Sequence, residues 1–338
     1  MDKIVFRGLV LTIIFSVFCV ACNWGNKGPD VSHINVEVNP KMFFVDLFEM
    51  DENNLEAETK QLYKTYGSYL SAYSQEIIKI GSPESSEYPN YIKSFINYED
   101  NKDVYEKCKE VYLDNRMLKD EFTEAFRHYK YYFSGAQVPD VYLHTSYFNQ
   151  SVALDSGWVS VSVEKYLGAD CEFYEWLSIP KYLRKKMVPQ KVVPDVMKAI
   201  AMSNHLREMK NEDVLSKMIQ QAKLNYFVKT MIPNIKDTLL FDYTKEQMKW
   251  CEHYEADIWA SMVEQKHLYN RERMVIQKYV GDSPFSYYFG QESPGRAAVF
   301  LGYRILEAFM KNNPELGLTD LLKENDAHLI LREARYRP

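Results

Sequence analysis

The sequence predicts an α+β fold that is predominantly α-helical and contains one small antiparallel sheet of about three to four strands. Helical stripes of apolar residues dominate most of the chain, whereas strict apolar/polar alternation is confined to short runs, most of them near its middle. A hydrophobic content of 46%, with 14% aromatic residues, is ample for a core. The chain shows no internal repeat and no linker after its N-terminal segment. We therefore expect a single domain over residues 33–338.

The N-terminus predicts a lipoprotein signal peptide over residues 1–21. Lys3 and Arg7 provide a basic start, and an apolar core follows from Gly8 to Val20. That core is shorter than the roughly 20 residues that span a membrane, as is typical of a secretory signal. It ends in Cys-Val-Ala-Cys, which resembles a bacterial lipobox with Cys22 as the acylated residue. A plain secretory signal and an uncleaved anchor are the alternatives.

Residues 22–32 predict a flexible tether between lipid and domain, because they are rich in Gly and Asn and contain a Pro. Removal of residues 1–21 takes away two of the 41 basic and one of the 47 acidic residues, which changes the net charge from −6 to about −7. An acidic protein has no electrostatic footprint for nucleic acid, so we expect none as a partner. The predicted lipid anchor makes the membrane a partner.

The pattern before the sheet predicts helices after one short strand. The alternation in residues 33–38 indicates the strand. Apolar spacing then predicts helices over residues 53–79, over 91–111 with an interruption near 99–102, and over 118–133.

The sheet itself is predicted from residues 141–147, 150–154 and 158–163, with the turn Asp155-Ser156-Gly157 between the last two. We interpret these strands as an antiparallel meander. His144 on the first of them is expected to be an ordinary packed or exposed sheet residue.

The remaining chain predicts helices over residues 214–230, 244–267, 274–280, 294–310, 319–323 and 326–334. Thr244 and Gln247 have the spacing of a capping box. Ser293 is the expected N-cap of the helix that starts at Pro294.

No residue pattern predicts catalysis, a cofactor or a metal site. HExxH, GxSxG, P-loop and GxGxxG motifs are all absent from the sequence. His205 and Glu208, three apart on a predicted helix, have no identifiable third ligand. The wide spacings of Cys108, Cys171 and Cys251 indicate small buried residues, with one disulfide as the alternative.

Residues 159–202 combine a strand, an aromatic loop and a helix. Tyr174 and Trp176 in the loop are expected to cover the core, with sugar stacking as the alternative. The basic run of Lys181, Arg184, Lys185 and Lys186 is interpreted as a solvated helix end.

Arg296 is expected to need an acidic partner, because it falls in the first turn of the predicted helix, where the dipole disfavours a cation. We predict a structural ion pair between Asp195 and Arg296. Asp195 is chosen because it also lies in a first turn, directly after Pro194.

Three segments, residues 166–201, 221–269 and 284–338, resemble the GldB family of gliding-motility lipoproteins of Bacteroidota. The most specific parts are Pro-Asp-Val-Met-Lys at 194–198, Ser-Pro-Gly-Arg at 293–296 with Gly-Tyr-Arg-Ile at 302–305, and the closing Tyr-Arg-Pro. The resemblance implies an outer-membrane lipoprotein connected with gliding and type IX secretion, whose partners are envelope motility or secretion proteins. It supplies no catalytic residue.

The layout is also similar to that of predicted zinc peptidases, in which a small sheet precedes an HExxH helix. Here the helix after Pro194 carries Asp195 and Lys198 in place of such ligands. The similarity would imply a degenerate, zincin-like arrangement without metal. We therefore expect a non-enzymatic lipoprotein, with an unrecognised hydrolase or a glycan- or peptide-binding protein as alternatives. Because no acidic cluster follows Cys22, we expect it to face the periplasm.

Overall fold

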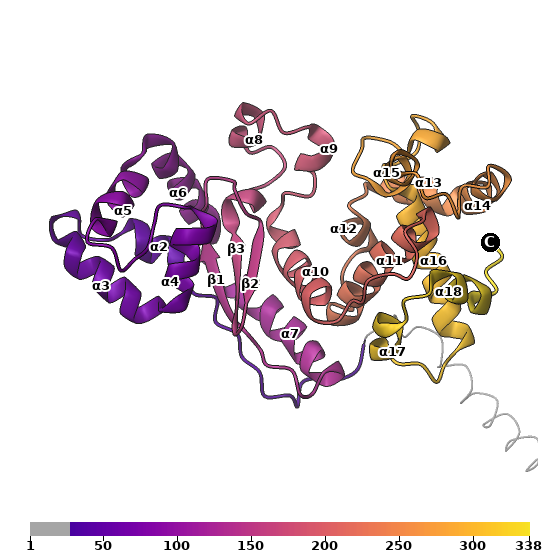
Figure 1. The fold of residues 1–338 in the computed structure, drawn as a ribbon, viewed down its shortest axis with the longest axis horizontal. Coiled ribbons are helices and arrows are strands. Elements are labelled where there is room, and N and C mark those ends of the chain that lie inside the picture. The colour runs from indigo at the N-terminus through magenta and orange to yellow at the C-terminus, as the bar shows by residue number, and fades with distance from the viewer. Residues whose placement is uncertain (1–27) are drawn as a thin grey trace, which may run out of the picture. The chain divides into compact units, whose positions relative to one another are not determined.

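The computed structural model describes residues 28–338, and Val31–Pro338 form one compact unit. The predicted signal peptide and Cys22 lie outside the described residues, as does most of the tether. The described chain is mainly helical with one three-stranded sheet, which confirms the predicted α+β class (Figure 1).

Apart from α2 (Phe43–Phe48), which was not predicted, the helices before the sheet are close to those predicted, but the helix expected over residues 53–79 is broken. They are α2, α3 (Leu55–Tyr66), α4 (Ser68–Ala72), a π-helical turn (Tyr73–Ile77), α5 (Tyr88–Asn97), α6 (Glu99–Tyr112) and α7 (Arg116–Tyr132). The helix predicted over residues 53–79 ends at Gly67, whose φ of 52° is outside the helical region. The predicted strand at residues 33–38 is wrong. In its place this segment is held by single bonds such as Val38 N–H to the Thr123 hydroxyl, 3.1 Å.

The sheet consists of β1 (Asp140–His144), β2 (Val152–Asp155) and β3 (Trp158–Ser162), in the order β1-β3-β2. β2 and β3 form the predicted antiparallel hairpin, but β1 runs parallel to β3. The fully antiparallel meander is therefore wrong, because residues 145–151 reverse the chain and leave room for β3 to lie between the other two strands.

Both faces of the sheet are covered. Val141, Leu143 and Val159 belong to the larger of two hydrophobic clusters, whereas Tyr142 and Trp158 pack into a smaller cluster formed by α2–α5. The serines of β3 are buried rather than solvated. Their hydroxyl groups are satisfied inside the protein, since Ser160 bonds His144 and Ser162 bonds Glu164. The alternation in β3 thus separates an apolar face from a hydrogen-bonded one.

The chain after the sheet is helical. It contains α8 (Glu172–Trp176), α9 (Lys181–Arg184), α10 (Val192–Asn204), α11 (Val214–Met231), α12 (Asp237–Phe241), α13 (Lys245–His253), α14 (Glu255–Glu264), α15 (Arg273–Val280), α16 (Ala297–Asn312), α17 (Leu318–Lys323) and α18 (Ala327–Ala334). The helix predicted over residues 244–267 is divided at Tyr254, and its capping box of Thr244 and Gln247 is confirmed.

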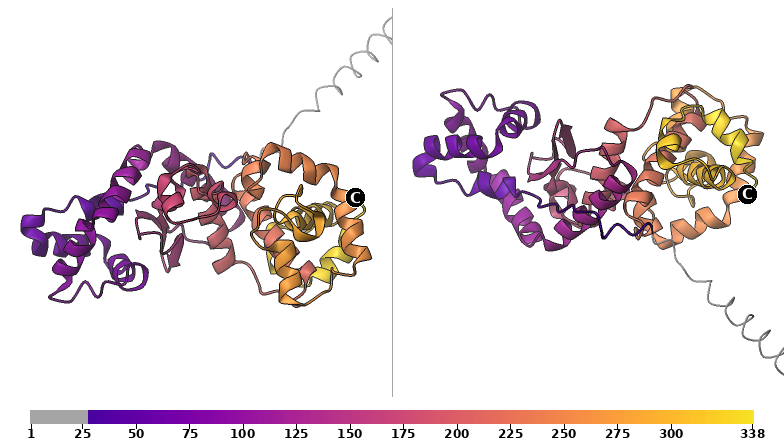
Figure 2. Two further views of the ribbon diagram at one scale, coloured as in Figure 1. Left: turned by 90° about the horizontal axis from the view of Figure 1, so that it is seen from above. Right: turned by 90° about the horizontal axis from the view of Figure 1, so that it is seen from below.

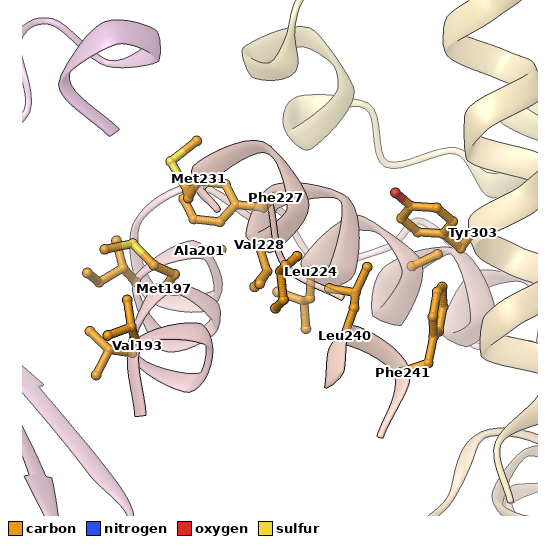
Figure 3. Close-up of a cluster of buried hydrophobic side chains, with 14 of the residues drawn as sticks. Val193, Met197, Ala201, Leu224, Phe227, Val228, Met231, Leu240, Phe241 and Tyr303 are labelled. Atoms are coloured by element: carbon orange, nitrogen blue, oxygen red, sulfur yellow. The ribbon is translucent and has the colours of Figure 1, made fainter. Parts of the chain in front are cut away.

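The larger cluster is built on α10, α11, α12 and α16. Figure 3 shows Met197 and Ala201 of α10 close to Phe227 and Val228 of α11, with Tyr303 of α16 beyond Phe241. Both views of Figure 2 show the sheet between the N-terminal helices and the C-terminal ones, and α11 packs against α16 among the latter. This packing fixes α10, whose N-terminal half bears the charged residues described below.

His144 is fully buried at the end of β1, as a packed sheet residue. Its Nδ1 lies 2.7 Å from the Ser160 hydroxyl, and its Nε2 has no partner among the described residues. Burial, assisted by the charge of Lys165, lowers the pKa of His144 from 6.5 to about 3. The folded protein therefore keeps this imidazole neutral where the unfolded chain protonates it.

We expect the stability of the protein to fall as the pH drops from 6.5 towards 3, because the unfolded chain then binds a proton that folded His144 does not. The contribution is about 1.4 kcal/mol for each pH unit, or about 2 kcal/mol at pH 5. Denaturant unfolding between pH 7 and pH 4 measures it. His144→Asn keeps a hydrogen-bond partner for Ser160 and should remove the part of the pH dependence of the unfolding free energy that His144 contributes. The matched change at exposed His253, to Asn, should leave it intact; equal slopes in both variants would contradict the assignment.

Candidate functional site

A cavity of about 750 Å³ opens between the N-terminal half of α10 and the loops that surround it. Its wall is contributed by segments far apart in the sequence: the turn after β3, the α8–α10 connection, α11, the end of α12, the end of α15 and the start of α16. The lining residues are Phe148, Ser151, Lys165, Tyr166, Ile179, Leu183, Lys186, Met187, Lys191, Asp195, Lys198, Gln221, Asp242, Val280, Gly281, Asp282 and Arg296.

A buried chain of charges forms the floor of this cavity. Lys191 Nζ lies 2.8 Å from Asp242 and 3.4 Å from Asp195, and it donates to the Leu239 carbonyl at 3.3 Å. The Lys191 side chain is only 3% exposed and that of Asp242 11%. Burial lowers the pKa of Lys191, but the two carboxylates outweigh it and the net pKa is raised. The pKa of Asp242 is lowered, because the cations around it, Lys191 first, outweigh its burial.

Arg296 is the last member of this chain of charges and contacts Asp242. Its guanidinium lies 3.5 Å from Asp242 and 3.7 Å from Asp282, and it donates to the Gln221 side chain at 3.3 Å. The predicted direct pair between Asp195 and Arg296 is thus not among the ion pairs of residues 28–338. Both residues line the same cavity, but Lys191 and Asp242 lie between them in the chain of contacts. Asp195 pairs with Lys191 and accepts a bond from Tyr166, 3.1 Å.

The start of α16 also differs from the prediction. The helix begins at Ala297 with Arg296 as its N-cap, in the left-handed region at φ 63°. Pro294 is therefore not its first residue, and Ser293 instead bonds the main chain at Ser286. The main-chain N–H of Ala297 is satisfied by the Ser286 hydroxyl at 2.9 Å. This turn directs Arg296 into the cavity rather than along the helix.

Gly295 lets the loop that follows α15 approach the turn that carries Arg296. A Cβ at Gly295 would lie 2.0 Å from the Ser283 carbonyl oxygen, which is far inside contact distance. Only glycine permits this approach, which brings neighbouring Asp282 to Arg296 and Lys186. Asp282 and Lys186 are 2.8 Å apart. The expectation of a solvated basic run is therefore wrong for Lys186, which lines the cavity and bridges two segments.

Two lysines of the cavity have no acidic partner. Lys198 on α10 and Lys165 after β3 make no ion pair and no side-chain hydrogen bond within the part of the chain that the structure describes. Burial, followed by repulsion from Lys191, lowers the pKa of Lys198 to about 8. Burial likewise lowers the pKa of Lys165, against the attraction of Glu164.

Buried Glu164 fixes the turn that carries Lys165 and Tyr166. One of its oxygens accepts bonds from the main-chain N–H groups of Ser146 and Phe148, 2.7 and 3.0 Å, and from the Ser162 hydroxyl, 2.7 Å. Burial nevertheless raises the pKa of this carboxyl, despite those bonds. The other oxygen has no partner within residues 28–338.

The other sequence candidates do not form a site. α10 ends at Asn204, so His205 and Glu208 do not share a helix, and His205 Nε2 instead meets the Tyr129 hydroxyl at 2.9 Å. No group of three His, Cys, Asp or Glu side chains suited to a metal occurs within residues 28–338. Cys108, Cys171 and Cys251 are all free thiols.

Of the two aromatic residues expected to cover the core, Tyr174 and Trp176, only Tyr174 is buried. Tyr174 is fully buried, donating to the Glu164 carbonyl and accepting from the Leu167 N–H. Trp176 instead remains 67% exposed, although its ring meets that of Phe173 edge-on. Tyr174 is thus unavailable for stacking on a sugar, whereas Trp176 is accessible.

Sequence reasoning identified Asp195, Lys198 and Arg296 as notable but missed their partners. Asp242 comes from a helix turn about 50 residues further on, and nothing in its local sequence marks it. Lys191 carried a usable signal, since it lies four residues before Asp195, where a helix brings side chains together. Chemically, the arrangement offers fixed positive charge on a partly apolar wall.

The class defined by these features is a mainly helical α+β domain with a charged cavity beside its sheet. A family model described as gliding motility protein GldB matches residues 25–338, so the chain belongs to that family. It is accordingly a gliding-motility lipoprotein of the cell envelope. No curated protein and no solved structure matches it significantly. The similarity in layout to zinc peptidases therefore rests on the sequence alone.

Among residues 28–338, no helix has the length and apolar character needed to cross a membrane.

Proposed function

We propose that this lipoprotein acts non-enzymatically, through contacts with proteins of the gliding and type IX secretion machinery. The observation that carries the proposal is the state of the cavity's carboxylates. Asp195, Asp242 and Asp282 each pair with a cation, so none is poised as a free general base. The same helix carries Asp195 and Lys198 where a peptidase of similar layout would carry HExxH.

We further propose that Cys22 carries the lipid and that the protein faces the periplasm from the outer membrane. Acyl chains contribute about 0.8 kcal/mol for each buried methylene, so several chains give a durable anchor. The absence of an acidic cluster after Cys22 favours the periplasmic side. Membrane fractionation and protease protection of intact cells test this, with Cys22→Ser as the unanchored control.

Affinity capture of the full-length lipoprotein from solubilised membranes tests the proposed contacts. We expect motility or secretion components to be recovered with the anchored protein, and to be depleted in capture with Cys22→Ser. Consistent absence of such components from the anchored sample would count against the proposal. Stoichiometric zinc together with peptidase activity would contradict the non-enzymatic role.

A glycan- or peptide-binding role has one observation in its favour, the exposed ring of Trp176. A glycan or peptide array with clear hits that disappear in Trp176→Ala would favour that role. Tyr287→Ala, which removes another exposed ring on a distant segment, is the matched control.

A further inference from the structure

We propose that the cavity beside α10 binds a small ligand through an anionic group, a carboxylate or a phosphate, and holds the ligand's apolar remainder against the opposite wall. This goes beyond the protein contacts proposed above and does not depend on them.

The charges of the cavity do not cancel. Five cationic side chains line it against three carboxylates. Asp242 and Asp195 are held by Lys191, and Asp282 by Lys186, while Arg296 shares Asp242 and Asp282 with them. This leaves Lys165 and Lys198 without a carboxylate partner in the described chain. The cavity therefore has positive charge in excess of what its own structure neutralises.

Lys198 is the more informative of the two. It lies on α10 one turn after Asp195, so the packed helix fixes its main chain. The Lys198 side chain is partly buried and has no carboxylate within ion-pair distance in the described chain, and such an ammonium group is less stable than one in open water. Nearby Asp195 and Asp242 attract Lys198, but Lys191 and Arg296 repel it. An anion in the cavity would supply the missing partner.

The rest of the wall suits an apolar group. Ile179, Leu183 and Met187 from the α8–α10 connection, Val280 from the end of α15 and Phe148 all face the cavity. Its volume of about 750 Å³ lies within the roughly 300–1,000 Å³ typical of small-molecule sites. A few convergent charges with apolar walls are the usual composition of such sites, in which the charges orient the ligand and the apolar wall contributes affinity.

Calorimetric titration of the full-length protein in a nonionic detergent tests the proposal. The probes are hexyl phosphate and hexanoate, which share the chain and differ in the anion, with hexylammonium as the cationic control and inorganic phosphate as the headgroup alone. We expect saturable binding at one site for at least one hexyl anion, weaker binding of inorganic phosphate and none of hexylammonium. Preference for one hexyl anion identifies the headgroup, and either preference supports the proposal.

Lys198→Met keeps the length of the side chain and removes its charge, so the affinity should fall by at least about tenfold. Lys165→Met should also weaken binding, and it provides the test if Lys198→Met does not fold. Lys102→Met, which removes an exposed lysine of α6, should bind as the native protein does. The proposal is overturned if neither hexyl anion binds, if hexylammonium binds equally well, or if both cavity variants keep full affinity.

Discussion

Gly302→Val is expected to cost at least about 3 kcal/mol of unfolding free energy, since it would separate the two most central helices. Gly302 lies on α16 where that helix meets α11. A Cβ there would lie 2.8 Å from the carbonyl oxygen of Met218 and 3.0 Å from its carbonyl carbon. These are main-chain atoms of a packed helix and cannot turn aside as the end of a side chain can. Valine adds two methyl groups to that overlap.

Denaturant unfolding of Gly302→Ala and Gly302→Val measures the effect. Alanine should cost less than valine, because its single methyl group overlaps less and it favours the helix by about 1 kcal/mol relative to glycine. Gly135→Ala is the control, since a Cβ at Gly135 would meet nothing within 4 Å. If Gly302→Val were as stable as Gly135→Ala, the close approach of α11 and α16 would be wrong.

The same geometry explains the segment that carries much of the family resemblance. Within residues 293–305, Gly295 permits the approach of Ser283, Arg296 enters the cavity and Gly302 permits the approach of α11. Three of its residues thus have separate physical reasons to be what they are. The closing Tyr-Arg-Pro has another, because the Tyr336 hydroxyl donates to Glu255 at 2.6 Å.

Local signals in the sequence were enough for most of the longer helices, though not for their breaks, and for the hairpin of β2 and β3. Apolar spacing reports which face of a helix is buried, and the Asp155-Ser156-Gly157 turn joins neighbours in sequence. The parallel pairing of β1 with β3 was not predictable in this way, because it depends on where residues 145–151 carry the chain. Nothing in the alternation of a strand specifies the direction of its neighbour.

In the cavity, too, some features follow from local sequence and others from long-range packing. Asp195 and Arg296 were identified because each lies near a helix start, which is a local property. Lys191, the partner of Asp195, lies one helical turn before it and could have been found locally. Asp242, which joins Lys191 to Arg296, follows from the way α10, α12 and α16 pack together. The polar side chains of β3 are buried because a second cluster of helices covers that face. Long-range packing, not local propensity, determines both the position of Asp242 and the burial of these serines.

Lys191→Met is expected to cost about 3–5 kcal/mol of unfolding free energy, the usual result of removing one member of a buried ion pair. Methionine fills a similar volume, but Asp242 would keep its charge in an almost fully enclosed place with only the more distant Arg296 as a partner. The Leu239 carbonyl would lose a donor as well. Chemical denaturation at pH 7 measures the loss, and the raised pKa of Lys191 means that the native ammonium is fully charged there.

Lys186→Met is the matched control, because it removes a lysine from the same cavity wall whose partner Asp282 is nearly half exposed. Water replaces such a partner readily, so this change should cost no more than about 1 kcal/mol. Combining Lys191→Met with Asp242→Asn should recover part of the loss, because the unpaired carboxylate is then gone. Equal, small losses for Lys191→Met and Lys186→Met would show that the charges on the cavity floor are solvated, and would remove the argument that α10, α12 and α16 are joined by a buried ionic network.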